Sequence, residues 1–126
     1  MRRQYHFREV GDNIHIWDVH RLVQLTKKIT VKKVLLAKIQ ELNEPYWFPN
    51  KYPTTQQIID HFKLIQDADL DYPIILCAQG RVMDGMHRVA KASLLKHTHI
   101  MAMQFEQTPK PDFINVDEND LDYDEI

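Results

Sequence analysis

Residues 72–105 of the chain read YPIILCAQGRVMDGMHRVAKASLLKHTHIMAMQF, and this stretch decides the fold. The apolar run at 73–78 predicts a short strand that opens with proline. Gln79-Gly80 predicts a tight two-residue turn, after which 81–84 returns as a second strand. The stretch therefore begins with a β-hairpin.

A helix and a third strand follow this hairpin. Gly85 ends the second strand, and residues 86–97 have the spacing of an amphipathic helix. Its predicted inward stripe consists of Met86, Val89, Ala90, Ser93 and Leu94. The apolar run at 99–105 predicts a further strand. Strand, hairpin, helix and strand together indicate an α+β fold with a small mixed β-sheet and packed helices.

Two further helices are expected before the hairpin. A helix around 18–28 fits the apolar spacing there, with Asp18 as its N-cap. The clearest helix is 54–68, where Thr54 and Gln57 have the spacing of a capping box.

The intervening segments are less regular. Residues 29–39 have a β-branched start that favours a strand, although their lysine spacing would also suit a helix. Residues 40–53 carry three prolines and three aromatic residues, which predicts a loop.

The totals indicate one ordinary globular domain. The chain has 126 residues, of which 44% are hydrophobic and 27% charged. We expect a single domain over 1–126, with a core at about 14–105 and an acidic tail at about 114–126. No apolar run reaches the roughly 20 residues that span a bilayer, and the start lacks the apolar stretch of a secretory signal. A single cysteine, Cys77, favours a reducing compartment, so we expect a cytoplasmic protein without membrane contact.

Charge is unevenly distributed. Residues 1–40 hold nine Lys/Arg and three Asp/Glu, a balance of +6, whereas 106–126 hold one Lys and eight Asp/Glu, a balance of −7. The two ends could pair with each other, face solvent, or form a basic binding surface and an acidic competitor. The lysines of such a surface would be Lys27, Lys28, Lys32, Lys33 and Lys38. We expect the first dozen residues to be loosely held and the tail to be too acidic to pack alone.

The turn at Gly85 has the features of an anion site. A helix N-terminus leaves backbone N–H groups unpaired and carries a partial positive charge, so it suits phosphate. Gly85 permits close approach of a ligand. Arg88 could grip two phosphate oxygens, His87 could donate one hydrogen bond, and Lys91 could share their face. The alternative is an ordinary turn, with Arg88 paired to the acidic tail.

These residues resemble the core of the ParB/sulfiredoxin-like superfamily. In that family a strand and a hairpin lead to a Gly-x-His-Arg or Gly-Glu-Arg-Arg turn that opens a helix, and a strand follows. Here the turn is Gly85-Met86-His87-Arg88, within 72–105. The helix at 54–68 would match the family's helix before the hairpin, and 29–39 its first strand.

The resemblance implies nucleotide binding at the turn. The implied phosphate-binding residues are Asp84, Gly85, Met86, His87, Arg88 and Lys91. The implied cofactor is a nucleoside triphosphate with Mg²⁺, and the ligand a nucleotide or another phosphorylated small molecule. Activities of the family include CTP hydrolysis and phosphorylation of free serine with a carboxylate base. A nucleotide hydrolase or small-molecule kinase is therefore one expectation, with Glu41, Glu44 and Asp84 as candidate catalytic carboxylates.

Two departures narrow these expectations. Met86 stands where sulfiredoxins carry their catalytic cysteine, and Cys77 reads as a buried strand residue, so sulfinic-acid reduction is not expected. ParB partition proteins add a helix-turn-helix DNA domain, for which we expect no room after the last strand. The alternative function is a non-catalytic DNA- or protein-interaction module of the same family. The sequence leaves the oligomeric state open.

Two other clusters carry weaker signals. The pair His97 and His99 lacks a third ligand nearby, so we expect no metal site. The aromatic residues of the loop could stack a nucleotide base, although such a cluster more often closes a core edge: Tyr46, Trp47, Phe48 and Tyr52.

Overall fold

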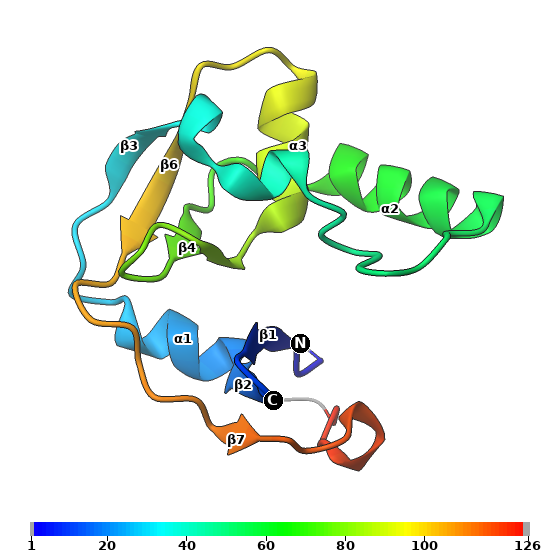
Figure 1. The fold of residues 1–126 in the computed structure, drawn as a ribbon. Helices are drawn as coiled ribbons and strands as arrows, with labels where there is room; N and C mark the ends of the chain where they lie inside the picture. The colour runs from blue at the N-terminus through cyan, green and yellow to red at the C-terminus, as the bar shows by residue number, and fades with distance from the viewer. Residues whose placement is uncertain (1, 125–126) are drawn as a thin grey trace.

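The computed structural model describes residues 2–124 and contains two β-sheets (Figure 1). The larger sheet has four strands in the order β3 (Lys32–Leu35), β6 (His99–Gln104), β4 (Ile74–Leu76) and β5 (Val82–Asp84). β6 pairs antiparallel with β3 and parallel with β4, while β4 and β5 form an antiparallel hairpin. The sheet is therefore mixed, and the expected α+β class is confirmed.

Apolar clusters cover both faces of this sheet. On one face Ile74, Leu76 and Ile100 pack against α3 (Met86–Leu94) and the loop that follows β3. On the other face Ile75 and Cys77 pack with Leu22 of α1 (Val19–Leu25). Because alternate residues of a strand point to opposite faces, the continuous apolar run of β4 is what a strand buried on both sides requires.

The smaller sheet has the order β1 (Tyr5–Val10), β2 (Asn13–Asp18) and β7 (Phe113–Ile114). β1 and β2 pair along six residues, from Tyr5 opposite Asp18 to Val10 opposite Asn13. The expectation of a loosely held N-terminus was therefore wrong. The reason is that the polar residues of β1 alternate with His6, which is buried, so a one-faced strand forms despite low overall hydrophobicity.

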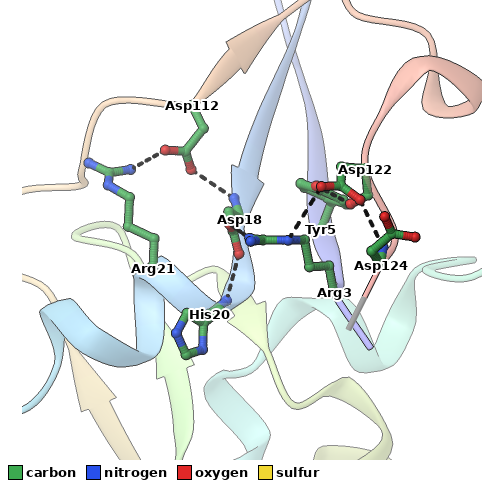
Figure 2. Close-up of polar contacts among 8 residues, drawn as sticks. All are labelled: Arg3, Tyr5, Asp18, His20, Arg21, Asp112, Asp122 and Asp124. Atoms are coloured by element: carbon green, nitrogen blue, oxygen red, sulfur yellow. Dashed lines mark hydrogen bonds and ion pairs between the residues drawn. The ribbon is translucent and has the colours of Figure 1, made fainter. Parts of the chain in front are cut away.

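The acidic tail also packs, contrary to expectation. It returns to the β1–β2 hairpin, pairs through β7, and continues through the short 3₁₀ helix Glu118–Asp120 to the buried Leu121. Figure 2 shows its carboxylates beside arginines of the N-terminal part: Asp112 bonds Arg21 at 3.1 Å, and Asp122 lies 3.9 Å from Arg3. Ordered structure thus extends beyond 14–105 on both sides.

α2 (Thr55–Asp67) forms as predicted, and both hydrogen bonds of the Thr54–Gln57 capping box are present. It nevertheless buries no residue and extends away from the sheets (Figure 1), with its contacts made mainly to α3. Four large apolar side chains on it are about half exposed: Ile58, Ile59, Phe62 and Leu64. Helical spacing was therefore correct, whereas the burial that it usually signals did not follow.

Three local expectations need correction. The hairpin loop is longer than two residues: Gly80 N–H bonds Cys77 O, Cys77 N–H bonds Arg81 O, and Gly80 has a φ of +81°. The buried stripe of α3 is Met86, Val89 and Ala92, while Ser93 and Leu94 are exposed.

The third concerns the first predicted strand. It ends at Leu35 and continues as two 3₁₀ turns, Leu36–Lys38 and Gln40–Asn43, so 29–39 is only partly extended. In the part of the chain that the structure covers, no helix is long and apolar enough to cross a membrane.

Candidate functional site

The turn at Gly85 joins β5 to α3 and has a geometry that only glycine tolerates well. Its φ is +101°, and an added Cβ would lie 2.7 Å from Ile74 Cγ2 and 3.0 Å from Arg88 Cζ. No side chain caps α3. Among residues 2–124 no acceptor is found for the backbone N–H groups of Met86, His87 and Arg88. The first turn of this nine-residue helix therefore keeps its donors and the positive end of its dipole.

Arg88 does not project a free guanidinium from this turn. Its Nη1 donates to the carbonyl oxygens of Tyr72 and Pro73 at 2.9 and 2.7 Å, and its Nη2 donates to Asp84 Oδ2 at 2.9 Å. Arg88 therefore ties the turn to the segment that enters β4, and Asp84 is its carboxylate partner. The alternative pairing of Arg88 with the acidic tail is not made.

Lys91 is likewise engaged within the protein. Its Nζ donates to Gln66 O at 2.9 Å and to Ala68 O at 2.7 Å. These are carbonyls at the end of α2, where a cation compensates the helix dipole. Lys91 thus docks α2 on α3 rather than joining His87 and Arg88 in one face.

His87 belongs to a compact aromatic group that the sequence did not predict. Its Nε2 lies 2.9 Å from Nδ1 of His61 on α2. Trp47 stacks on both imidazoles, with ring centroids 4.5 Å from His87 and 4.7 Å from His61, and Phe48 contacts His61 edge-on. We call these four residues the His–Trp cluster. It brings the loop after β3 to the start of α3.

The His–Trp cluster favours neutral imidazoles. Burial, followed by the neighbouring His61, lowers the pKa of His87 to about 4, and burial lowers the pKa of His61. Two ring nitrogens at hydrogen-bond distance need one proton between them, because a second proton would oppose two donors and two charges. At neutral pH His87 can therefore donate a hydrogen bond to a ligand but adds no full charge.

The two loop carboxylates fasten the loop to the β4–β5 hairpin. Glu41 is 3% exposed; its Oε2 accepts from Val82 N–H at 2.6 Å and lies 3.4 Å from Arg81 Nε. Its Oε1 is buried with no hydrogen-bond partner among residues 2–124. Glu44 accepts two bonds from Arg81, at 2.6 and 3.0 Å, and the hydrogen bond from Arg81 lowers the Glu44 pKa.

Tyr46 lies between these carboxylates and the turn. Burial, then the charges of Glu41 and Asp84, raise the pKa of its hydroxyl to about 12. Tyr46, Trp47 and Phe48 are partly buried, whereas Tyr52 is fully exposed, so the predicted aromatic group divides. The loop approaches the Gly85 turn through Tyr46 and Trp47, and not through Glu44.

Sequence reasoning identified the turn and missed three of its neighbours. His61 was set aside as a lone helical histidine, and Arg81 and Tyr46 received no role. The available signal was that His61 lies on the helix directly before the hairpin. For metal, no group of three or more His, Cys, Asp or Glu able to hold an ion occurs within 2–124, and His97 and His99 are exposed.

Comparison with models of known families, with curated proteins and with solved structures finds no match to this chain.

Proposed function

We propose that this chain is a ParB/sulfiredoxin-like domain that binds a nucleoside triphosphate, or another phosphorylated small molecule, at the start of α3. One observation carries the proposal: the first turn of α3 begins at a left-handed glycine and presents backbone N–H groups without acceptors among residues 2–124. The resemblance of Gly85-Met86-His87-Arg88 to the family's phosphate turn supports the same ligand.

The contacts suggest a division of roles in this proposal. The N–H groups of Met86, His87 and Arg88 would hold a phosphate, and Gly85 would let it approach. His87 would add one hydrogen bond through Nδ1, because its Nε2 faces His61. Arg88 would act as a positioning residue, since its guanidinium is bonded to Asp84 and two carbonyls.

The Mg²⁺ of a nucleotide needs few protein ligands, because phosphate oxygens and water complete its shell. Asp84 Oδ1 has no hydrogen-bond partner in the described part of the chain and would be its ligand. Turnover would further require a base. Glu44 is bonded to Arg81 and Glu41 to Val82, so binding is better supported than hydrolysis or phosphoryl transfer. The proposed location is the cytoplasm, where Cys77 stays reduced.

The test uses a charge reversal inside the turn. His87→Glu places an anion in the first turn, which suits the helix dipole but repels phosphate. We expect calorimetry with Mg²⁺ to show binding of CTP, ATP or GTP to the parent chain and at least about tenfold weaker binding to His87→Glu. The matched control His97→Glu changes the charge equally at an exposed histidine. Absence of binding by all three nucleotides, or equal affinity of both variants, contradicts the proposal.

A second candidate function is a protein-interaction module without catalysis. The observation that favours it is the exposed apolar side of α2, formed by Ile58, Ile59, Phe62 and Leu64. Substituting Ile59 and Phe62 by Ser should then increase solubility and leave nucleotide binding unchanged. Parent chain that is as soluble as the double variant across concentrations would remove the reason for this candidate.

A further inference from the structure

The cations of the first forty residues divide into two groups. The arginines bond the C-terminal segment and its neighbours: Arg3 bonds Asp18 at 3.0 Å, Arg21 bonds Asp112 at 3.1 Å, and Arg2 donates to Tyr123 O (Figure 2). The lysines have no ion pair and no hydrogen bond within residues 2–124: Lys27, Lys28, Lys32, Lys33 and Lys38. The acidic tail therefore neutralises the arginines and leaves the lysines uncompensated.

Three of these lysines line a cleft of about 540 Å³. Lys32 and Lys33 lie on β3, and Lys38 lies on the 3₁₀ turn that follows it. Gly80 of the hairpin loop also lines the cleft, together with Leu76 at the end of β4. The cleft is distinct from the Gly85 turn, which contacts Ile74 at the other end of β4.

The walls of the cleft combine apolar area with unused amide groups. Val34, Ile39 and Leu76 contribute apolar surface. Gln40 and Gln79 accept hydrogen bonds through Oε1, so their NH₂ groups have no partner within 2–124. Gln104 donates through Nε2 to Cys77 O and Ala78 O, so its carbonyl oxygen has none. The cleft therefore offers donors, an acceptor, an apolar floor and cations to one ligand.

We propose that this cleft is a binding site for a small organic phosphate, with the phosphate held by Lys32, Lys33 and Lys38 and the organic part on the amides and the apolar floor. Its volume lies in the range of small-molecule pockets, about 300–1,000 Å³. Clustered cations that lack protein partners attract a multiply charged anion.

Protection of the sheet edge and binding of nucleic acid each account for less of this arrangement. Lysines on an edge strand discourage pairing with other chains, and β3 is such an edge. This covers Lys32 and Lys33 but not Lys38, which lies outside the strand and also lines the cleft. A single-stranded nucleic acid would need aromatic side chains on which bases stack, and among residues 2–124 none lines the cleft.

The experiment follows backbone amide shifts of the full chain by NMR during titration with AMP, inorganic phosphate, adenosine and a single-stranded oligonucleotide. We expect AMP at up to millimolar concentration to shift Lys33, Gly80 and Gln104. Adenosine should not do so, because it lacks the charge. Inorganic phosphate should act more weakly than AMP, because it lacks the organic part. Shifts at Met86–Arg88 report the proposed nucleotide site separately, so either site can fail alone.

The double variant Lys32→Gln/Lys38→Gln removes two charges from the cleft, and Lys27→Gln/Lys28→Gln removes two charges outside it. We expect the first to weaken AMP binding at the cleft at least about tenfold and the second to leave it within about twofold. Circular dichroism verifies that both fold. No cleft shift with AMP, equal losses in the two variants, or binding of the oligonucleotide with no effect of AMP overturns the proposal.

Discussion

Glu41 and Glu44 are three residues apart, yet their positions imply different roles. Glu41 is buried and accepts from Val82 N–H, whereas Glu44 is exposed and pairs with Arg81. We expect Glu41→Ala to lower the free energy of unfolding by about 1–3 kcal/mol, because it leaves a buried donor unsatisfied. Glu44→Ala should cost less than about 1 kcal/mol, as exposed ion pairs do. Urea unfolding of both variants measures the difference, and equal losses would contradict a structural role for Glu41.

The His–Trp cluster makes stability depend on pH. The pKa of His87 is about 4 in the folded protein and about 6.5 in an unfolded chain, so the unfolded state binds more protons between these values. Stability contributed by neutral His87 is therefore present above about pH 6.5 and is lost as the pH falls towards 4. His6, whose pKa burial lowers to about 3, acts in the same direction.

A variant separates the contribution of His87 from that of His6. Urea midpoints between pH 7 and 4.5 should fall more steeply for the parent chain than for His87→Gln, which cannot titrate. His97→Gln, at an exposed position, should follow the parent. Parallel pH curves for the parent and His87→Gln would show that the cluster does not exclude protons.

At the scale of elements, the start of α3 depends on one backbone conformation. Gly85→Ala would combine a positive φ with a Cβ 2.7 Å from Ile74 Cγ2. Gly11 has a φ of +61° with nothing near its Cβ position, so Gly11→Ala tests the conformational part alone. We expect a loss of about 1–2 kcal/mol at Gly11 and a larger loss at Gly85. Thermal unfolding measures both, and a Gly85 loss no greater than that at Gly11 would mean that the turn relaxes.

α2 gives a prediction about local stability. It buries no residue, so it should open without global unfolding. Thr54→Ala removes the cap that accepts from Gln57 N–H, and we expect about 1 kcal/mol less protection of α2 amides in hydrogen exchange. Protection in β4 and β6 should stay unchanged. Thr55→Ala is the matched control, and an equal effect of both substitutions would rule out the capping box as the cause.

The elements differ in how far the sequence could predict them. α2 was predicted almost to the residue because its capping box and helical spacing are local signals. β1 and the tail were missed because each is stabilised by the other: Arg3 and Tyr5 of the N-terminal part bond Asp122. Such pairing joins residues more than a hundred positions apart, and local composition carries no trace of it.

The candidate site divides in the same way. The Gly85 turn is visible in the sequence because glycine, helix start and strand end are contiguous. The partners of its side chains are not, since Arg88 contacts carbonyls of Tyr72 and Pro73 that no side-chain pattern identifies. The stacking of His61, His87 and Trp47 depends on how α2 docks on α3. The sequence therefore locates a site better than it assigns the donors within it.

At the scale of the whole molecule, the tail holds the smaller sheet together by packing as well as by charge. Leu121 is buried, Tyr123 contacts the ring of Tyr5 edge-on at 5.3 Å, and Arg3 lies beside Asp122 (Figure 2). A chain that ends at Asn115 keeps β7 and loses these contacts. We expect its free energy of unfolding to be about 1–3 kcal/mol lower, chiefly through the lost burial of Leu121.

The charge part of this effect can be isolated. Glu118→Gln/Asp120→Asn removes two carboxylates that form no ion pair within residues 2–124 and leaves the packing in place. In hydrogen exchange, the shortened chain should lose protection in β1 and β2 while β4 and β6 retain theirs, and the double variant should match the parent. If the double variant instead loses as much protection as the shortened chain, net charge rather than packing stabilises the sheet. Because the larger sheet carries both the Gly85 turn and the lysine-lined cleft, the shortened chain should also keep any ligand binding at either place.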